Sequence, residues 1–268
     1  MLICPNCGNK LTRIDNTLKC KNNHSFDIAS SGYCNLLVGS KAGEFKGDNK
    51  EMVMARRMFL DSGAYESLRD AVCSTVQRLS PSVIIDAGCG EGYYTRAVTQ
   101  TLANSNPELI VIGADISKSA TQYAAKRDKL TTYITASCFH LPVESGCANL
   151  VLSLFAPSAA AEFSRVLTEN GVVVQVVPGD DHLWELKEAI YDEAYKNREE
   201  KHALDGFELI GREKITYKRT IDTPELIKAL FSMTPYVHRT SKEGIDRLNA
   251  LTSIELTLSF LILTFKKI

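Results

Sequence analysis

The sequence has few backbone breakers and lacks a long apolar run. Its 268 residues include only 16 Gly and 8 Pro, while 44% are hydrophobic, which excludes a collagen-like, low-complexity or disordered chain. The most apolar segment, Leu256–Phe265, is much shorter than the ~20 residues of a membrane-spanning helix, so we interpret it as a core strand. The amino-terminal residues do not have the pattern of a secretion signal, which is a positively charged segment followed by an apolar one. We therefore expect a cytoplasmic protein with no membrane partner, built from one large domain and a small satellite.

The sequence also lacks an excess of charge of one sign, because 31 Lys and Arg nearly balance 32 Asp and Glu. A net charge of −1 by itself predicts no polyanionic partner. The distribution is uneven, however: residues 1–60 contain nine Lys or Arg and five Asp or Glu, whereas the remainder contain 22 and 27. An acidic partner would bind at the basic amino-terminal end, although the same charges could simply solvate a small domain.

Three cysteines and one histidine near the amino terminus have a spacing that is typical of metal sites. The pattern is Cys4-x-x-Cys7, twelve residues, and then Cys20-x-x-x-His24. Two thiolates from one turn and a second pair from a facing hairpin suit tetrahedral zinc. The surrounding segment has too few apolar residues to fold by burial alone, which argues against four unrelated side chains. Because all four positions are filled by protein, we expect a structural zinc and not a catalytic one.

The rest of the chain alternates predicted strands and helices. We divide it into a module at 1–37, a glycine-containing flexible linker at 38–50 and a large domain at 51–268. Continuous β-branched runs indicate parallel strands buried on both faces, so we predict an α/β, doubly wound Rossmann-like domain. Later strands at Thr216–Ile221 and Ile254–Phe265 would add an antiparallel edge. The predicted helices are Glu51–Leu60, Tyr65–Leu79, Tyr93–Leu102, Lys118–Arg127, Ala159–Leu167, His182–Tyr195 and Pro224–Ser232.

A glycine-rich loop follows the first strand of the large domain. It contains Asp86, Gly88, Gly90, Glu91 and Gly92 in a GxGxG spacing, whereas a dinucleotide site has GxGxxG with a pyrophosphate at the helix start. Two carboxylates would repel a pyrophosphate but suit the ammonium and sulfonium charges of S-adenosylmethionine. The loop therefore favours S-adenosylmethionine as the cofactor.

Other loops at strand ends supply further candidates. Asp115 closes the next strand, where a carboxylate can bind ribose hydroxyls of either cofactor. The loop Ser137–Pro142 could meet an adenine edge or be an ordinary loop. After the following strand, Phe155-Ala156-Pro157 contains no thiol and no Asn/Asp-Pro-Pro-aromatic motif, so covalent catalysis is disfavoured. No catalytic residue can be assigned from the sequence.

With these residues identified, the sequence resembles the bacterial 23S rRNA (guanine-N1)-methyltransferases over essentially its whole length. Five phrases stand in family order: CPxCxxxL…C…H-x-FD (Cys4–Asp27), GYxNLL (Gly32–Leu37), MxxARRxFLDxGxY (Met52–Tyr65), DxGCGEGYYT (Asp86–Thr95) and PGxxHLxELK (Pro178–Lys187).

The resemblance implies methylation of N1 of one guanine in a 23S rRNA hairpin, with the zinc module helping to recognise the RNA. It implies that Cys4, Cys7, Cys20 and His24 hold the metal. It also implies that Tyr65, Gly90, Glu91 and His182 contact the cofactor. Tyr65 could instead be a helix-packing aromatic residue, and His182 a helix-start residue.

The mechanism and two other functions stay open at this point. Guanine N1 carries a proton in its neutral form, and no residue identifies itself as the base. A small-molecule methyltransferase would share the glycine-rich loop but would not need a basic zinc module. A non-catalytic zinc-containing RNA-binding protein would need that loop to be vestigial. Because the module is too small to form a nucleic-acid cleft alone, we also expect a possible homodimer.

Overall fold

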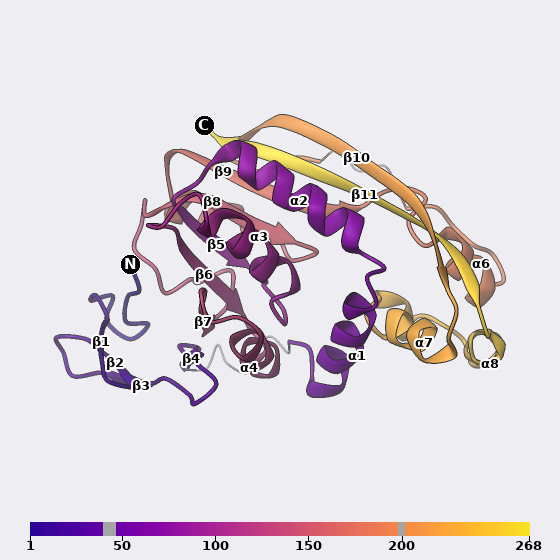
Figure 1. Cartoon of the computed structure of the whole chain (residues 1–268), viewed down its shortest axis with the longest axis horizontal. Helices are drawn as coiled ribbons and strands as arrows, with labels where there is room; N and C mark the ends of the chain where they lie inside the picture. The colour runs from indigo at the N-terminus through magenta and orange to yellow at the C-terminus, as the bar shows by residue number, and fades with distance from the viewer. Residues whose placement is uncertain (40–46, 198–201) are drawn as a thin grey trace.

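The computed structural model describes residues 1–39, 47–197 and 202–268. A small antiparallel sheet, β1 (Thr12–Ile14), β2 (Thr17–Lys19) and β3 (Ser25–Asp27), forms the core of the amino-terminal module. This module lies at one end of the long axis of the molecule, and the carboxy-terminal helices lie at the other (Figure 1).

The large domain is built on one eight-stranded sheet. Its order is β10-β11-β9-β8-β5-β6-β7-β4, and all neighbours from β9 to β4 are parallel. The strands are β4 (Cys34–Asn35), β5 (Val83–Ala87), β6 (Ile110–Asp115), β7 (Thr132–Thr135), β8 (Ala148–Leu154), β9 (Leu167–Pro178), β10 (Phe207–Ile221) and β11 (Ile254–Lys267). β11 is antiparallel to both β9 and β10, so the predicted doubly wound sheet with an antiparallel edge is confirmed.

Both faces of this sheet are covered. Ile84 and Ile85, adjacent in β5, are fully buried in two different hydrophobic clusters, as the alternation of side chains along a strand requires. β5 pairs with β6 on one side and β8 on the other, so the strand order reverses at β5. Ligands bind beyond the carboxyl ends of the strands at such a reversal.

All the predicted helices are present, one of them shortened, and the structure also contains helices that the sequence did not predict. They are α1 (Lys50–Asp61), α2 (Glu66–Leu79), α3 (Tyr93–Ala103), α4 (Lys118–Arg127), α5 (Ala160–Val166), α6 (Trp184–Ile190), α7 (Pro224–Ser232), the 3₁₀ helix η2 (Pro235–His238) and α8 (Lys242–Ala250). The helix predicted from His182 to Tyr195 is too long, because Leu183 is left-handed and Tyr191 is extended. The sequence reading also missed α8, and β10 begins nine residues before the predicted strand. No helix among the described residues is long and apolar enough to cross a membrane.

The amino-terminal module is packed against the large domain. The N–H of Ile3 donates to the carbonyl of Pro142 at 2.9 Å, and Leu2 forms a β-bridge with Val143. β4, inside the segment predicted as the module, pairs with β7 at the edge of the main sheet. The domain boundaries stay a prediction, and the two parts share one hydrophobic cluster. Most of the predicted linker, residues 40–46, lies outside the described residues.

Candidate functional site

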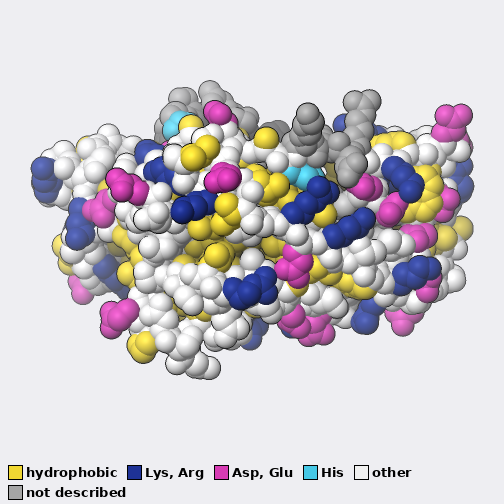
Figure 2. Space-filling model, turned by 90° about the horizontal axis from the view of Figure 1, so that it is seen from above, with side chains coloured by type: hydrophobic (Ala, Val, Ile, Leu, Met, Phe, Trp, Pro, Cys, Tyr) yellow, Lys and Arg dark blue, Asp and Glu magenta, His cyan; other side chains and the backbone are white. Residues whose placement is uncertain are grey.

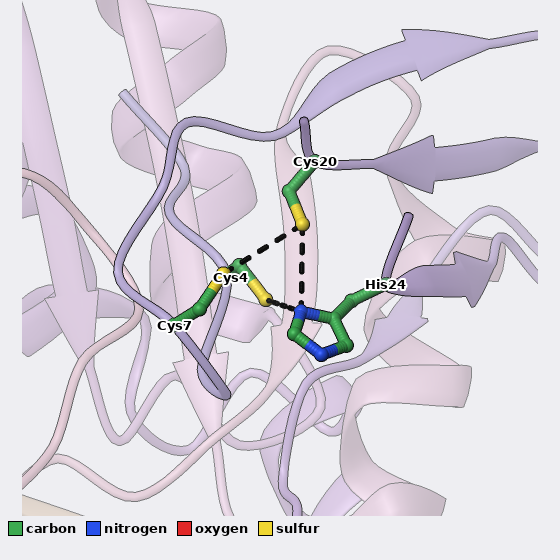
Figure 3. A group of neighbouring side chains, drawn as sticks. All are labelled: Cys4, Cys7, Cys20 and His24. Carbon is green, nitrogen blue, oxygen red and sulfur yellow. Dashed lines mark hydrogen bonds between the residues drawn. The ribbon is translucent and has the colours of Figure 1, made fainter. Parts of the chain in front are cut away.

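The four predicted metal ligands converge. Cys4 and Cys7 lie on the turn before β1, Cys20 directly follows β2, and His24 directly precedes β3 (Figure 3). Their ligand atoms all lie within 4.8 Å of one another. Cys7 Sγ is 3.7 Å from Cys20 Sγ, and His24 Nδ1 is 3.4 Å from Cys4 Sγ. With Zn–S bonds of ~2.3 Å, the edges of a tetrahedron measure about 3.8 Å, so the cluster has the size of a zinc site.

The environment of the cluster suits a closed structural site. Hydrogen bonds from the backbone N–H and the side-chain amide of Asn9 lower the pKa of the Cys7 thiol to about 6, which favours the thiolate that binds metal. Cys4 and Cys20 are buried. Three sulfurs and one ring nitrogen complete a tetrahedral shell, so the residues fit a zinc ion that holds the module together.

The glycine-rich loop between β5 and α3 is shaped by backbone that only glycine adopts easily. Gly88, Gly90 and Gly92 all have positive φ, between 54° and 102°. A Cβ on Gly88 would lie 2.5 Å from the Cβ of Ala156, and one on Gly92 would lie 3.0 Å from Ala124. A Cβ on Gly90 would meet nothing within 4 Å. Gly88 and Gly92 therefore permit close packing, while Gly90 leaves open space at the edge of the loop.

Asp86 lies beneath this loop and is almost fully buried. Its Oδ2 accepts a hydrogen bond of 2.7 Å from the Thr95 hydroxyl, and Oδ1 has no partner among the described residues. Burial raises the pKa of Asp86 to about 7. A buried oxygen without a partner favours a cationic or donor ligand nearby, although Asp86 does not itself line the adjacent cavity.

Asp115, at the end of β6, is held by two backbone N–H groups. Gly90 donates to its Oδ2 at 2.9 Å and Ser117 to its Oδ1 at 2.7 Å. Burial nevertheless raises the pKa of this carboxyl group above its ordinary value. The carboxylate thus ties the glycine-rich loop to the loop after β6, and its remaining lone pairs can accept ribose hydroxyls.

Glu91 has a protein partner that the sequence did not reveal. The carboxylate is 1% exposed and lies 2.8 Å from the Arg127 guanidinium, which also pairs with Asp61. Burial raises the pKa of Glu91 to about 7 against the opposing effect of Arg127. The Arg127 guanidinium therefore already neutralises part of the negative charge that was expected to attract a cationic cofactor.

A cavity of about 250 Å³ lies beyond the ends of β5 and β6. It is lined by five of the eight predicted cofactor residues: Tyr65, Gly88, Gly90, Glu91 and Asp115. Ser137, Cys138 and Phe139, from the loop considered for the adenine edge, also line it. Of the others, Asp86 and Gly92 are not among the lining residues, and His182 lines a different cavity. The direct contacts expected for these three stay predictions.

Tyr65 and His182 form a buried pair whose hydrogen bonds have a fixed direction. The backbone N–H of Ser259 donates to His182 Nδ1 at 3.3 Å, so this nitrogen must accept. Burial lowers the pKa of His182 to about 3, and the neutral ring therefore carries its proton on Nε2. Nε2 lies 3.4 Å from the Tyr65 oxygen and donates to it. The Tyr65 hydroxyl proton is then available to an acceptor in the cavities.

A second cavity, of about 440 Å³, adjoins the first and shares part of its wall. The residues common to both are Arg56, Tyr65, Phe155, Ala156 and Met233. Sequence reasoning did not find this cavity, because its walls come from α1, the ends of β8 and β9, and the region from α7 to η2. The signals in the sequence were the phrase MxxARRxFLDxGxY, which contains Arg56 and Tyr65, and the phrase PGxxHLxELK, which contains His182.

On the face seen in Figure 2, Lys and Arg side chains are interspersed with Asp and Glu. This face therefore presents no field of a single sign. Binding to a polyanion would depend on local clusters of basic side chains and not on the whole surface.

Comparison with known proteins gives these sites a family context. Residues 2–42 match the family model for the RlmA amino-terminal zinc ribbon, and residues 85–175 match the model described as a methyltransferase domain. A 23S rRNA (guanine(748)-N(1))-methyltransferase from Streptomyces fradiae is 31% identical over 96% of this chain and 94% of the relative. The chain belongs to the 23S rRNA (guanine-N1)-methyltransferase family.

Other relatives extend the same comparison. YxjB of Bacillus subtilis (strain 168) is 28% identical over 96% of this chain and 94% of its own length. Among solved structures, the YcgJ protein from Bacillus subtilis superposes with a TM-score of 0.49 and 14% identity, over 74% of this chain and 97% of that one.

Membership of this family assigns chemistry to the two sites already described. The glycine-rich loop and Asp115 belong to an S-adenosylmethionine-binding methyltransferase domain, whose cofactor supplies an electrophilic methyl group. The Cys4, Cys7, Cys20 and His24 cluster lies within the residues that match the zinc ribbon, and its donor set fits a structural zinc ion.

Proposed function

We propose that this protein methylates N1 of a specific guanine in a hairpin of 23S rRNA, using S-adenosylmethionine. The observation that carries the proposal is that a zinc-ribbon match and a methyltransferase-domain match lie in one packed chain. A methyltransferase for small molecules has no need of a basic zinc module. A non-catalytic RNA-binding protein has no need of the open space at Gly90 or the held carboxylate of Asp115.

The reaction requires the target nitrogen to become a nucleophile. The residues that line the first cavity, Gly90 and Asp115 among them, would hold S-adenosylmethionine, which would supply the methyl group. N1 would give its proton to water and take the methyl group, and the electron pair of the broken carbon–sulfur bond would stay on sulfur. The protein contributes by holding the base in line with the methyl group. The Tyr65 hydroxyl can donate to an oxygen on which negative charge develops as the proton leaves.

The decisive experiment is transfer of a labelled methyl group to unmodified 23S rRNA, followed by primer extension. N1 methylation removes a Watson–Crick donor, so reverse transcription should stop beside a single guanine. Gly90→Val serves as the inactive control. Label found only in small metabolites, or in rRNA without a primer-extension stop, would refute the proposal.

A protein that modifies rRNA would act in the cytoplasm. Because the amino-terminal module is small, we also propose that the protein is a homodimer that clamps the RNA hairpin between its two copies. Light scattering with and without RNA tests the dimer. A monomeric mass under both conditions would refute it.

A further inference from the structure

Phe155 lies on the wall that the two cavities share and has a strained backbone conformation. It directly follows β8 and is a non-glycine residue with φ of +55°. The residue is 40% exposed, although its side chain is large and apolar. Left-handed backbone at such a residue is strained and persists only where the surrounding structure imposes it, often at ligand sites.

The surroundings of Phe155 hold its ring in place. Its N–H donates to the carbonyl of Val176 at 3.1 Å. The ring centroids of Phe260, Tyr94 and Tyr65 lie 5.8, 6.4 and 6.5 Å away. A flat apolar surface is thus presented on the wall that the first cavity, beside the glycine-rich loop, shares with the second cavity. Bases taken out of a helix stack on aromatic surfaces of this kind.

The polar groups of the second cavity suit a ring that is rich in acceptors. No Asp or Glu is among the described residues that line it. Arg56 contributes a guanidinium, which is also paired with Asp48 at 2.8 Å. The direction of the His182 to Tyr65 hydrogen bond leaves the Tyr65 hydroxyl as a donor. Guanine presents acceptors at O6 and N7, so these donors complement it.

We propose that the second cavity receives the target guanine, flipped out of the hairpin, and that Phe155 is the platform on which the base stacks beside the cofactor. This inference rests on the proposed function and adds to it the pocket for the base and a positioning residue. Arg56 and Tyr65 would meet the O6 edge, while the ring of Phe155 fixes the plane of the base. N1 would then be directed towards the shared wall and the methyl group.

A matched pair of substitutions tests the stacking role. Phe155→Leu keeps an apolar side chain but loses the flat ring, whereas Phe155→Tyr keeps the ring. We expect Phe155→Leu to reduce kcat/KM for 23S rRNA at least about tenfold, and Phe155→Tyr to remain close to the wild type. Calorimetry should give both variants wild-type affinity for S-adenosylmethionine, and both should keep the wild-type melting temperature.

Photo-crosslinking supplies a readout that does not depend on activity. A hairpin with 6-thioguanosine at the target position is irradiated with the S-adenosylhomocysteine complex, and mass spectrometry locates the linked peptide. Because the sulfur replaces O6, we expect crosslinks at Tyr65 or Arg56, which line the cavity where the O6 edge would lie, or at the stacked ring of Phe155.

Three results with rRNA would overturn this inference while leaving the proposed function intact, and a fourth concerns the cofactor. These are full rRNA activity of Phe155→Leu, an equal loss in the leucine and tyrosine variants, and crosslinks confined to other surfaces. Loss of cofactor affinity in Phe155→Leu would also overturn it, by assigning Phe155 to the cofactor site. An inactive wild-type protein on 23S rRNA would instead refute the proposed function and this inference together.

Discussion

The hydroxyl oxygen of Tyr65 lies 3.4 Å from Nε2 of His182, although 117 positions separate them in the sequence. Because Ser259 N–H occupies the other ring nitrogen, the imidazole donates and the phenol accepts. Both residues are buried, and burial raises the pKa of Tyr65 far above its usual value. The pair is therefore neutral at physiological pH and acts through the direction of its hydrogen bonds.

The first prediction is that His182 stays neutral well into the acid range. Burial lowers its pKa from 6.5 to about 3, so its ring NMR signals should not titrate between pH 8 and pH 5. The unfolded chain takes up this proton near pH 6.5, while the folded protein does so near pH 3. The contribution of the neutral His182 ring to the free energy of unfolding is therefore fully present above pH 6.5 and is lost as the pH falls towards 3. A ring that titrates near pH 6.5 in the folded protein contradicts the prediction; the urea-unfolded protein provides the reference.

The second prediction concerns Asp86→Asn in the ligand-free protein. The folded-state pKa of Asp86 is raised from 3.8 to about 7, so ionising it costs stability as the pH rises through this window. Asn is nearly isosteric and carries no charge. The variant should exceed the wild type in unfolding free energy by an amount that grows from pH 4 to pH 8, on the order of 4 kcal/mol at most.

Urea unfolding at several pH values measures this difference. Glu91 and His182 also titrate, but they are common to both proteins and cancel in the comparison. Asp222→Asn, at an exposed carboxyl group, serves as the control for the loss of one surface charge. A constant difference between Asp86→Asn and the wild type from pH 4 to pH 8 would rule out the raised pKa.

The third prediction separates backbone strain from cofactor contact. Gly90 and Gly146 both have positive φ, 54° and 63°, and a Cβ on either meets nothing within 4 Å. Valine at either position should therefore cost a similar amount of stability. Only Gly90→Val fills the cofactor cavity, so it should lose S-adenosylmethionine affinity while Gly146→Val keeps it. Calorimetry on the two folded variants decides, and equal affinities would remove Gly90 from the cofactor site.

The fourth prediction concerns the zinc ribbon. Cys7→Ser should release the metal and loosen the module, because much of the free energy of folding at such sites comes from metal binding. The described residues of the cofactor cavity begin at Gly47, so S-adenosylmethionine binding should remain near normal. Methylation of rRNA should fall sharply, and the residual RNA affinity should depend less on salt.

Cys147→Ser is the matched control, since Cys147 lies outside the metal cluster. It should retain zinc and activity, measured by metal analysis and by methyl transfer. Wild-type methylation by zinc-free Cys7→Ser would show that the ribbon takes no part in substrate recognition.

The sequence by itself determined the features that depend on local spacing. Cys4, Cys7, Cys20 and His24 identified the metal cluster because two short turns bring each pair together. The glycines of the loop after β5 and the alternation of strands with helices predicted the fold and the cofactor site, because each is set within a few consecutive residues. Helix ends were less certain, as the shortened α6 shows, since a single left-handed residue at Leu183 overrides a helical pattern.

Only the tertiary structure decided which side chains and which strands lie next to one another. Arg127 meets Glu91 across 36 positions, and β4 joins the main sheet through pairing with β7. The left-handed backbone of Phe155 and the second cavity beside it arise from elements distant in sequence. No local pattern encodes such pairings, because their free energy comes from burial and long-range contacts that exist only once the sheet and its helices have packed.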